Sequence, residues 1–228
     1  MRRFSFGLLL VVCFCVNCEK KNTIEPDQND VTGTVTDIDG NVYQTIKIGT
    51  QWWMKEDLKV THYRNGDTIP YITDQQVWRN LTTGAYCDHI DDAGWVDTYG
   101  HLYNWYAMTD SGHLAPAGWH VPTDGEWGTL INYLTPGPNQ PPGGRMKEAG
   151  TSHWSSPNTG ATNESGFTAL PDDAGLDGQG RYACYCGLTE HDIPFVTLLV
   201  LSYDNVGCNM WDEEGGMNRS FSVRCVKD

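Results

Sequence analysis

Alternating hydrophobic and polar positions near the start of the chain predict a β-hairpin. Residues 31–48 read VTGTVTDIDGNVYQTIKI, with β-branched side chains at alternate positions on either side of Asp39-Gly40-Asn41. Asp-Gly and Gly-Asn pairs tolerate the positive φ angles of tight turns, which favours a turn here. Asp37 and Asp39 also suggest a calcium loop, but glycine stands at its fourth position instead of the sixth, and no glutamate closes it. We therefore interpret the segment as a hairpin.

A pattern with helical period predicts the clearest helix of the chain. Thr123 and Glu126 form a capping box, in which each side chain bonds the backbone N–H of the other residue. Pro136 and the residues around it end the helix. Its apolar face, at spacings i, i+3, i+4 and i+7, consists of Trp127, Leu130, Ile131 and Leu134.

The other patterned segments are shorter. Leu102, Trp105 and Tyr106 lie at helical spacing within residues 99–108, which predicts a short buried helix. The run 136–144 contains four prolines and three glycines and is expected to be a surface loop. Strands are predicted over residues 167–170, 195–203 and 220–226.

The first residues have the features of a secretory signal. Arg2 and Arg3 precede 13 uncharged residues, 4–16, fewer than the roughly 18–20 that span a bilayer as a helix. The region around Cys18 resembles a bacterial lipoprotein signal, in which the cysteine after the cleavage site is lipidated. We expect residues 1–17 to be removed and Cys18 to carry the lipid, which implies an outer-membrane lipoprotein on the surface or periplasmic face. An ordinary cleaved signal is the alternative.

The composition fits one folded domain on a tether. Residues 18–33 are almost entirely polar and are expected to form the tether, whereas residues 34–228 show no repeat and no shift in composition. Because 39% of the 228 residues are hydrophobic, the chain can bury a core. Fifteen Lys and Arg against 29 Asp and Glu give a net charge of −14, which repels phosphate backbones and argues against nucleic-acid binding.

The cysteines suggest disulfides, because an exported protein folds in an oxidising compartment. Five cysteines follow Cys18, an odd number that predicts two disulfides and one remaining thiol. Cys184 and Cys186 are too close in sequence to bridge each other easily, so one of them is expected to pair with Cys208. This choice leaves Cys87 for Cys225. The alternative is a zinc site made by Cys184, Cys186, Cys208 and His191, although its C-x-C spacing is tighter than that of zinc knuckles.

Six segments place the chain near a known family. Together they resemble the Fibrobacter succinogenes major paralogous domain family, found on exported proteins and lipoproteins of Bacteroidota-like bacteria. The resemblance covers about residues 34–228. In order, the segments are residues 34–67, 84–87, 99–107, 118–127, 156–171 and 221–228.

A more distant similarity to the sulfatase-modifying-factor and C-type-lectin-like superfamily rests on VPTDGEW after Trp119-His120 and on a closing strand ending in RCV. It implies a compact α+β domain with a small antiparallel sheet, two short helices and long loops. It also implies that both termini of the domain meet in one sheet.

The segment 171–217 departs from the family pattern, which weakens any catalytic interpretation. The enzymes of the superfamily that generate formylglycine use two cysteines and copper, but Cys184 and Cys186 stand in a different context and at a different spacing. No metalloprotease, nucleophile-elbow or phosphate-loop motif occurs. We therefore expect no catalytic residue and no obligatory cofactor.

Binding is the better hypothesis for an anchored, acidic and aromatic-rich domain. Exposed tryptophan faces stack on sugar rings or on protein side chains. The candidates are the tryptophans in polar or glycine-rich surroundings, Trp95, Trp154 and Trp211, whereas Trp52, Trp105, Trp119 and Trp127 are expected in the core. Oxygen-rich loops add calcium as a candidate ion, with turn capping as the alternative role of the same residues. These residues are Asn158, Asn163, Glu164, Asp172, Asp173 and Asp177.

The sequence thus predicts a non-catalytic lipoprotein of the cell envelope that binds a glycan or a protein. A structural envelope domain with protein partners only, and an enzyme related to the sulfatase-modifying fold, are the alternatives.

Overall fold

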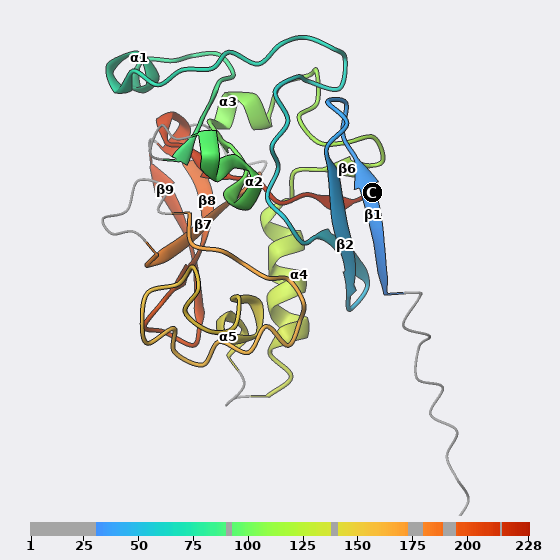
Figure 1. Cartoon of the computed structure of the whole chain (residues 1–228), viewed down its shortest axis with the longest axis vertical. Helices are drawn as coiled ribbons and strands as arrows, with labels where there is room; N and C mark the ends of the chain where they lie inside the picture. Colours follow the sequence, from blue (N-terminus) through green and yellow to red (C-terminus); the bar gives the residue numbers. More distant parts are fainter. Residues whose placement is uncertain (1–30, 90–92, 138–140, 173–179, 189–194, 215) are drawn as a thin grey trace, which may run out of the picture.

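The computed structural model describes residues 31–89, 93–137, 141–172, 180–188, 195–214 and 216–228, which form an α+β fold with two β-sheets (Figure 1). Several predicted features lie outside these residues: the signal, nearly all of the tether, Cys18, Asp173, Asp177 and His191. Within the described ranges, no helix is both long and apolar enough to cross a membrane.

The first sheet is antiparallel and joins the two ends of the folded chain. The sheet contains the predicted hairpin and the last strand of the chain. In that last strand, Val226 pairs with Trp53 on one side and with His120 on the other. The termini of the domain therefore meet in one sheet, as the resemblance implied. In spatial order its strands are β1 (Thr32–Thr36), β2 (Val42–Ile48), β3 (Gln51–Met54), β11 (Val226–Lys227) and β6 (Trp119–His120).

The second sheet has six strands, and β9 is one of its edges. All pairs are antiparallel except β10 with β7. Its spatial order is β4 (Tyr86–Cys87), β5 (Leu102–Tyr103), β10 (Phe221–Ser222), β7 (Tyr182–Gly187), β8 (Phe195–Ser202) and β9 (Cys208–Glu214).

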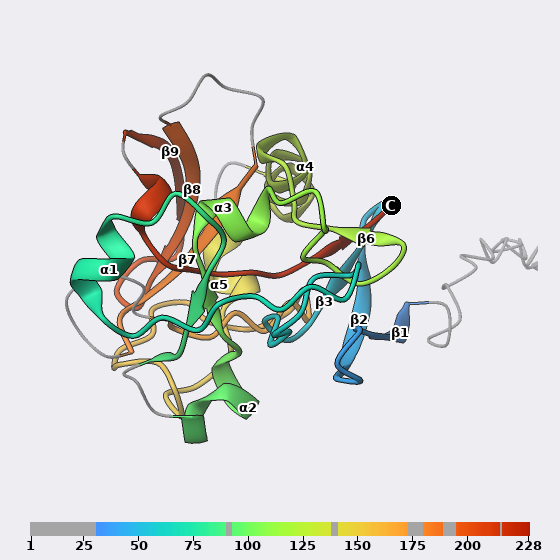
Figure 2. The same cartoon turned by 90° about the horizontal axis from the view of Figure 1, so that it is seen from above.

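Helix α4 (Asp124–Leu134) lies between the two sheets in both views (Figures 1 and 2). Its capping box of Thr123 and Glu126 is formed as predicted, and Trp127, Leu130 and Leu134 are buried. The other helices are α1 (Gln75–Arg79), α2 (Val96–Tyr99), α3 (Trp105–Met108) and α5 (Pro142–Met146), with short 3-10 turns η3 (Ala93–Trp95) and η4 (Gly216–Asn218). The described chain thus has more helical segments than the two that the resemblance implied.

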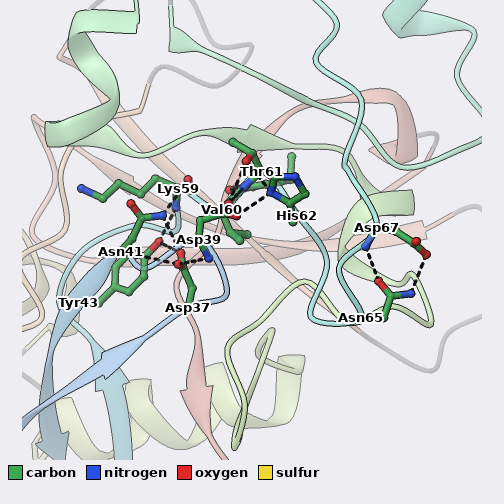
Figure 3. A network of polar contacts seen from close by, with 11 residues as sticks. Asp37, Asp39, Asn41, Tyr43, Lys59, Val60, Thr61, His62, Asn65 and Asp67 are labelled. Atoms are coloured by element: carbon green, nitrogen blue, oxygen red, sulfur yellow. Dashed lines mark hydrogen bonds and ion pairs between the residues drawn. The ribbon is translucent and has the colours of Figure 1, made fainter.

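The hairpin turn is fixed by its own acidic residues (Figure 3). One Asp37 oxygen accepts the backbone N–H groups of Asp39 and Asn41, at 3.0 and 2.9 Å, and the other accepts the Tyr43 hydroxyl at 2.7 Å. Asp39 reaches across to His62, with Oδ1 2.6 Å from Nδ1. The carboxylates therefore close the turn and fasten it to the neighbouring segment, which confirms a hairpin turn.

Four predicted elements need correction. The closing strand 220–226 is two short strands, β10 and β11, because the chain leaves one sheet and crosses to the other between them (Figure 2). Residues 167–170 make only an isolated bridge, Lys147 with Ala169. Within 136–144, Pro142–Gly144 are buried at the start of α5 and are not surface loop. Leu102 lies in β5, so the helix expected over 99–108 is confined to α3.

Candidate functional site

Side chains of β7, β8 and β9 alternate between two faces of the six-stranded sheet. Cys184, Leu198 and Val200 belong to one hydrophobic cluster, whereas Tyr185 and Leu199 belong to the other, against α4. Trp211 of β9 pairs with Leu198 of the adjacent strand β8, so the two side chains lie on the same face of the sheet. Unlike those partners, Trp211 is 42% exposed.

A cavity of about 290 Å³ opens on this face, and we call it the Trp211 pocket. Its size is at the lower end of the about 300–1,000 Å³ common for ligand sites. The floor is apolar, and the polar atoms stand at the rim. Its lining residues are Cys184, Leu198, Val200 and Phe221 of the floor and Trp211, Glu213 and Arg219 of the rim.

The rim is held by an ion pair between Arg219 and Glu213, with Nη2 and Oε1 2.5 Å apart. The Arg219 side chain is 40% exposed, so its guanidinium remains accessible to a ligand. The turn η4 before it packs directly on the sheet: a Cβ at Gly216 would lie 2.2 Å from a methyl carbon of Val196. Glycine at this position therefore lets the turn approach the sheet and sets where Arg219 stands.

An apolar floor with an aromatic edge and one charged pair suits binding more than chemistry. An apolar group can enter the cavity, and the Arg219–Glu213 pair can accept and donate hydrogen bonds at its mouth. The nearby Cys186 is poorly suited to act as a nucleophile, because burial raises the pKa of its thiol to about 12. Thiolate chemistry requires the opposite shift.

The other two predicted tryptophans differ from Trp211. Trp154 is only 1% exposed and donates from Nε1 to the carbonyl of Ala169 at 2.9 Å, so it is a core residue and its prediction as a ligand contact was wrong. Trp95 is half-buried and stacks on Tyr99 with ring centroids 5.0 Å apart. It lies in η3, away from the elements that line the Trp211 pocket. Its role in binding stays a prediction.

The predicted disulfides are absent, because the strands hold the cysteines apart. Cys87, Cys184, Cys186, Cys208 and Cys225 are all thiols in the structure. Cys184 and Cys186 belong to the cluster on one sheet face, whereas Cys208 packs against the cluster on the other face. Strand β8 also separates β7 from β9, a gap of about 10 Å, beyond the about 7 Å Cα limit of a disulfide.

No disulfide joins Cys225 to Cys87 either. Cys87 pairs with Leu102, which pairs with Ser222, so two strand spacings separate Cys87 from β10. Cys225 lies beyond β10, where its carbonyl accepts the N–H of Met54 in the other sheet at 3.1 Å. The opposed faces also keep Cys208 away from Cys184 and Cys186 as zinc ligands. Across the described ranges, no group of three or more His, Cys, Asp or Glu side chains is placed to hold a metal.

The described calcium candidates serve their own loops. The side-chain nitrogen of Asn158 donates to the carbonyls of Glu148 and Gly150, at 2.9 and 2.6 Å. Asn163 bonds both the backbone and the hydroxyl of Thr168 at 2.9 Å.

The acidic candidates are also engaged. Glu164 lies 3.4 Å from Arg145, and Asp172 accepts the N–H of Cys184 at 2.9 Å. These two contacts join residues far apart in sequence and do not cap turns, and calcium binding stays a prediction.

A second polar cluster joins the residue before β5 to the residue after β4. Asp88 Oδ1 lies 2.6 Å from His101 Nδ1, and Asp88 Oδ2 accepts the Tyr71 hydroxyl at 2.9 Å. Burial lowers the pKa of His101 even though Asp88 favours its charged form. Both carboxylate oxygens are engaged, so the cluster fastens neighbouring segments and offers a ligand less than the Trp211 pocket does.

Arg219 is the site residue that the sequence did not indicate. It follows the divergent segment 171–217, between β9 and β10, and no motif or period marks it. Glu213 stands in the acidic run 212–214, which by itself indicates no site. The single signal that pointed to this place was Trp211, an aromatic residue among polar neighbours.

The fold and the site define an α+β domain with a small, mainly apolar pocket beside a sheet edge. Residues 46–227 match the profile of the Fibrobacter succinogenes major domain. The chain therefore belongs to this family, as the sequence motifs indicated. No curated protein and no solved structure matches the chain.

Proposed function

We propose that this protein is a non-catalytic binding module of the cell envelope and that the Trp211 pocket is its ligand site. The observation that carries the proposal is the combination at one place of a 42% exposed tryptophan, a cavity of about 290 Å³ and an accessible Arg219–Glu213 pair. Exposed aromatic residues and arginine are enriched where proteins bind partners.

The chemistry of the floor indicates what enters. Leu198, Val200 and Phe221 offer no hydrogen bonds to hydroxyl groups, so the floor favours an apolar group. A protein side chain supplies such a group more readily than a sugar does. Stacking of a sugar ring on Trp211 at the rim is the second candidate, favoured by the exposure of that ring alone.

The proposed setting is a lipoprotein, anchored through Cys18 by the polar tether predicted over residues 18–33. The terminal strands β1 and β11 share one sheet, an arrangement consistent with the lectin-like fold that the sequence resemblance implied. The net charge of −14 supports a partner that is neutral or basic.

The test is binding by the full-length protein in detergent to a glycan array, with and without EDTA, and to a peptide array. Trp211→Ala should abolish the signal of every specific hit. The matched control is Tyr133→Ala, which removes a 59% exposed aromatic ring from α4. Hits that survive Trp211→Ala, or are lost equally with Tyr133→Ala, would place the ligand elsewhere. Loss of binding with EDTA would support the calcium hypothesis.

A further inference from the structure

Strand β9 is a long edge with one side available. Its seven residues, Cys208–Glu214, all pair with β8 on one side. Within the described part of the chain, no strand pairs with its other side, and β9 is the outermost strand of the six-stranded sheet (Figures 1 and 2). Such an edge presents a row of N–H and C=O groups that another extended chain can bond.

The edge and the Trp211 pocket adjoin each other. Trp211 and Glu213 are residues of β9 and also form the rim of the cavity. A strand added beside β9 would place alternate side chains on the pocket face, about 4.5–5.5 Å from Trp211 and Glu213. These side chains would pack against Trp211 and Glu213 at the rim of the cavity.

The opposite face of the same edge carries one carboxylate among its described side chains, Asp212, beside Cys208 and Met210. Asp212 points to that face, where its carboxylate accepts the Thr197 hydroxyl at 2.7 Å, and it remains exposed. Trp211 on the pocket face therefore favours an apolar side chain opposite it, and Asp212 on the other face favours a basic one. The net charge of −14 adds attraction for a basic segment and opposes pairing with a second copy of this chain.

We propose that the ligand of this site is an extended polypeptide segment with alternating apolar and basic residues, which adds to β9 as a seventh strand. The inference rests on the proposed function and names the partner class of the same site. Main-chain hydrogen bonds to β9 would hold the segment, and Trp211 would pack against one of its apolar side chains.

The test uses labelled nine-residue peptides, in which valine or phenylalanine alternates with lysine, and the full-length protein in detergent. Two isomers carry N-methyl groups on either the odd or the even amides. Because successive N–H groups of a strand point to opposite sides, only one isomer can still bond β9. We expect one isomer to bind like the parent peptide and the other to bind at least about tenfold more weakly.

Two protein variants sharpen the result. Trp211→Ala should weaken the parent peptide at least about tenfold, whereas the Tyr133→Ala control should not. Asp212→Lys should weaken the lysine peptide and restore binding of a peptide in which glutamate replaces lysine. This restoration requires a folded protein, so it separates the proposal from a general loss of structure.

The outcomes distinguish the two proposals. If both N-methyl isomers bind equally while Trp211→Ala still abolishes binding, strand addition is overturned and the pocket remains the ligand site. If glycans bind through Trp211 and no peptide binds, strand addition is overturned and the Trp211 pocket remains the ligand site. If neither probe class depends on Trp211, both proposals fail. Dimerisation through β9 would also overturn the peptide as its occupant.

Discussion

Arg224 and Asp57 form an ion pair in the interior of the domain, with Nε and Nη2 of Arg224 each 2.7 Å from the same Asp57 oxygen. The guanidinium also lies 4.4 Å from the ring centroid of Phe167 and 5.5 Å from that of Tyr185. Arg224 stands between β10 and β11, where the chain crosses from one sheet to the other. The pair thus fixes the crossing segment against the core.

Breaking this pair should destabilise the protein strongly. Arg224→Met leaves the Asp57 carboxylate buried without its partner, which costs about 3–5 kcal/mol. Urea denaturation should show the loss as a lower midpoint with an unchanged slope. The matched control is Arg79→Met at the exposed end of α1, for which we expect no shift beyond about 0.5 kcal/mol. A similar effect of both substitutions would contradict the role of the pair.

The hairpin turn should depend on Asp37 more than on other acidic turn residues. Asp37→Ala removes the acceptor of the Tyr43 hydroxyl and of two backbone N–H groups, so we expect a loss of about 1–3 kcal/mol. Asp67→Ala is the control, since Asp67 accepts only from Asn65 among the contacts shown in Figure 3. Thermal unfolding of both variants is the measurement, and equal midpoints would refute the prediction.

A pH-dependent contribution to stability should come from His120. Burial alone would lower the pKa of His120, but contacts at 2.6 Å to Asp228 and 2.8 Å to Glu126 outweigh it and raise the pKa above the ordinary 6.5. A raised folded-state pKa means that the stabilisation is fully present below pH 6.5 and is lost as pH rises through the folded value.

The test compares wild type with His120→Gln between pH 5.5 and 9. The difference in melting temperature should be largest at the acidic end and shrink towards pH 9. Because 37% of the side chain is exposed, the effect should stay below about 1 kcal/mol, or ~2–4 °C. A difference that grows with pH would have the wrong sign.

The cysteines should be reduced and protected. Burial raises the pKa of Cys186 to about 12 and that of Cys208 to about 11, and it also raises the pKa of Cys225. Iodoacetamide should therefore label these three residues slowly in the native protein and rapidly after denaturation. Peptide mapping of the alkylated protein, before and after denaturation, measures the labelling of each cysteine. Alkylation at isolation preserves the reduced or oxidised state that each cysteine has in the protein. A disulfide linking Cys208 to Cys184 or Cys186 would contradict the strand order of the six-stranded sheet.

Local patterns in the sequence predicted the elements that depend on local chemistry. The turn at Asp37–Asn41 and the capping box of Thr123 were visible because their hydrogen bonds join residues a few positions apart. The strand over 195–203 was visible because it is apolar on both faces, and it indeed lies inside the sheet as β8.

Long-range partners were not visible in the same way. Residues 220–226 read as one strand, since nothing local shows that the chain changes sheets between Phe221 and Val226. The predicted pairing of Cys184 or Cys186 with Cys208 was wrong for a related reason. The spacing of these cysteines in the sequence does not reveal the strand order, which places β8 between them, or the opposite faces on which they lie.

The site was only partly predictable. Trp211 and Trp154 both stand among polar neighbours, but Trp154 packs in the hydrophobic core, where the carbonyl of Ala169 accepts its indole N–H. The pairing of Glu213 with Arg219 depends on the turn η4, which brings together residues on either side of it. Their meeting is a property of the fold and not of any motif.

The proposed function requires Trp211 to be the point of contact with a ligand. The direct measurement is an ¹⁵N NMR titration of the protein's nine tryptophan indole signals with the glycan and peptide hits, with Trp211 assigned from the signal lost in Trp211→Ala. If Trp211 contacts the ligand, the ligands should shift the Trp211 signal in a saturable manner and leave the signal of buried Trp154 unchanged. Saturable binding that leaves the Trp211 signal in place would contradict the proposed function.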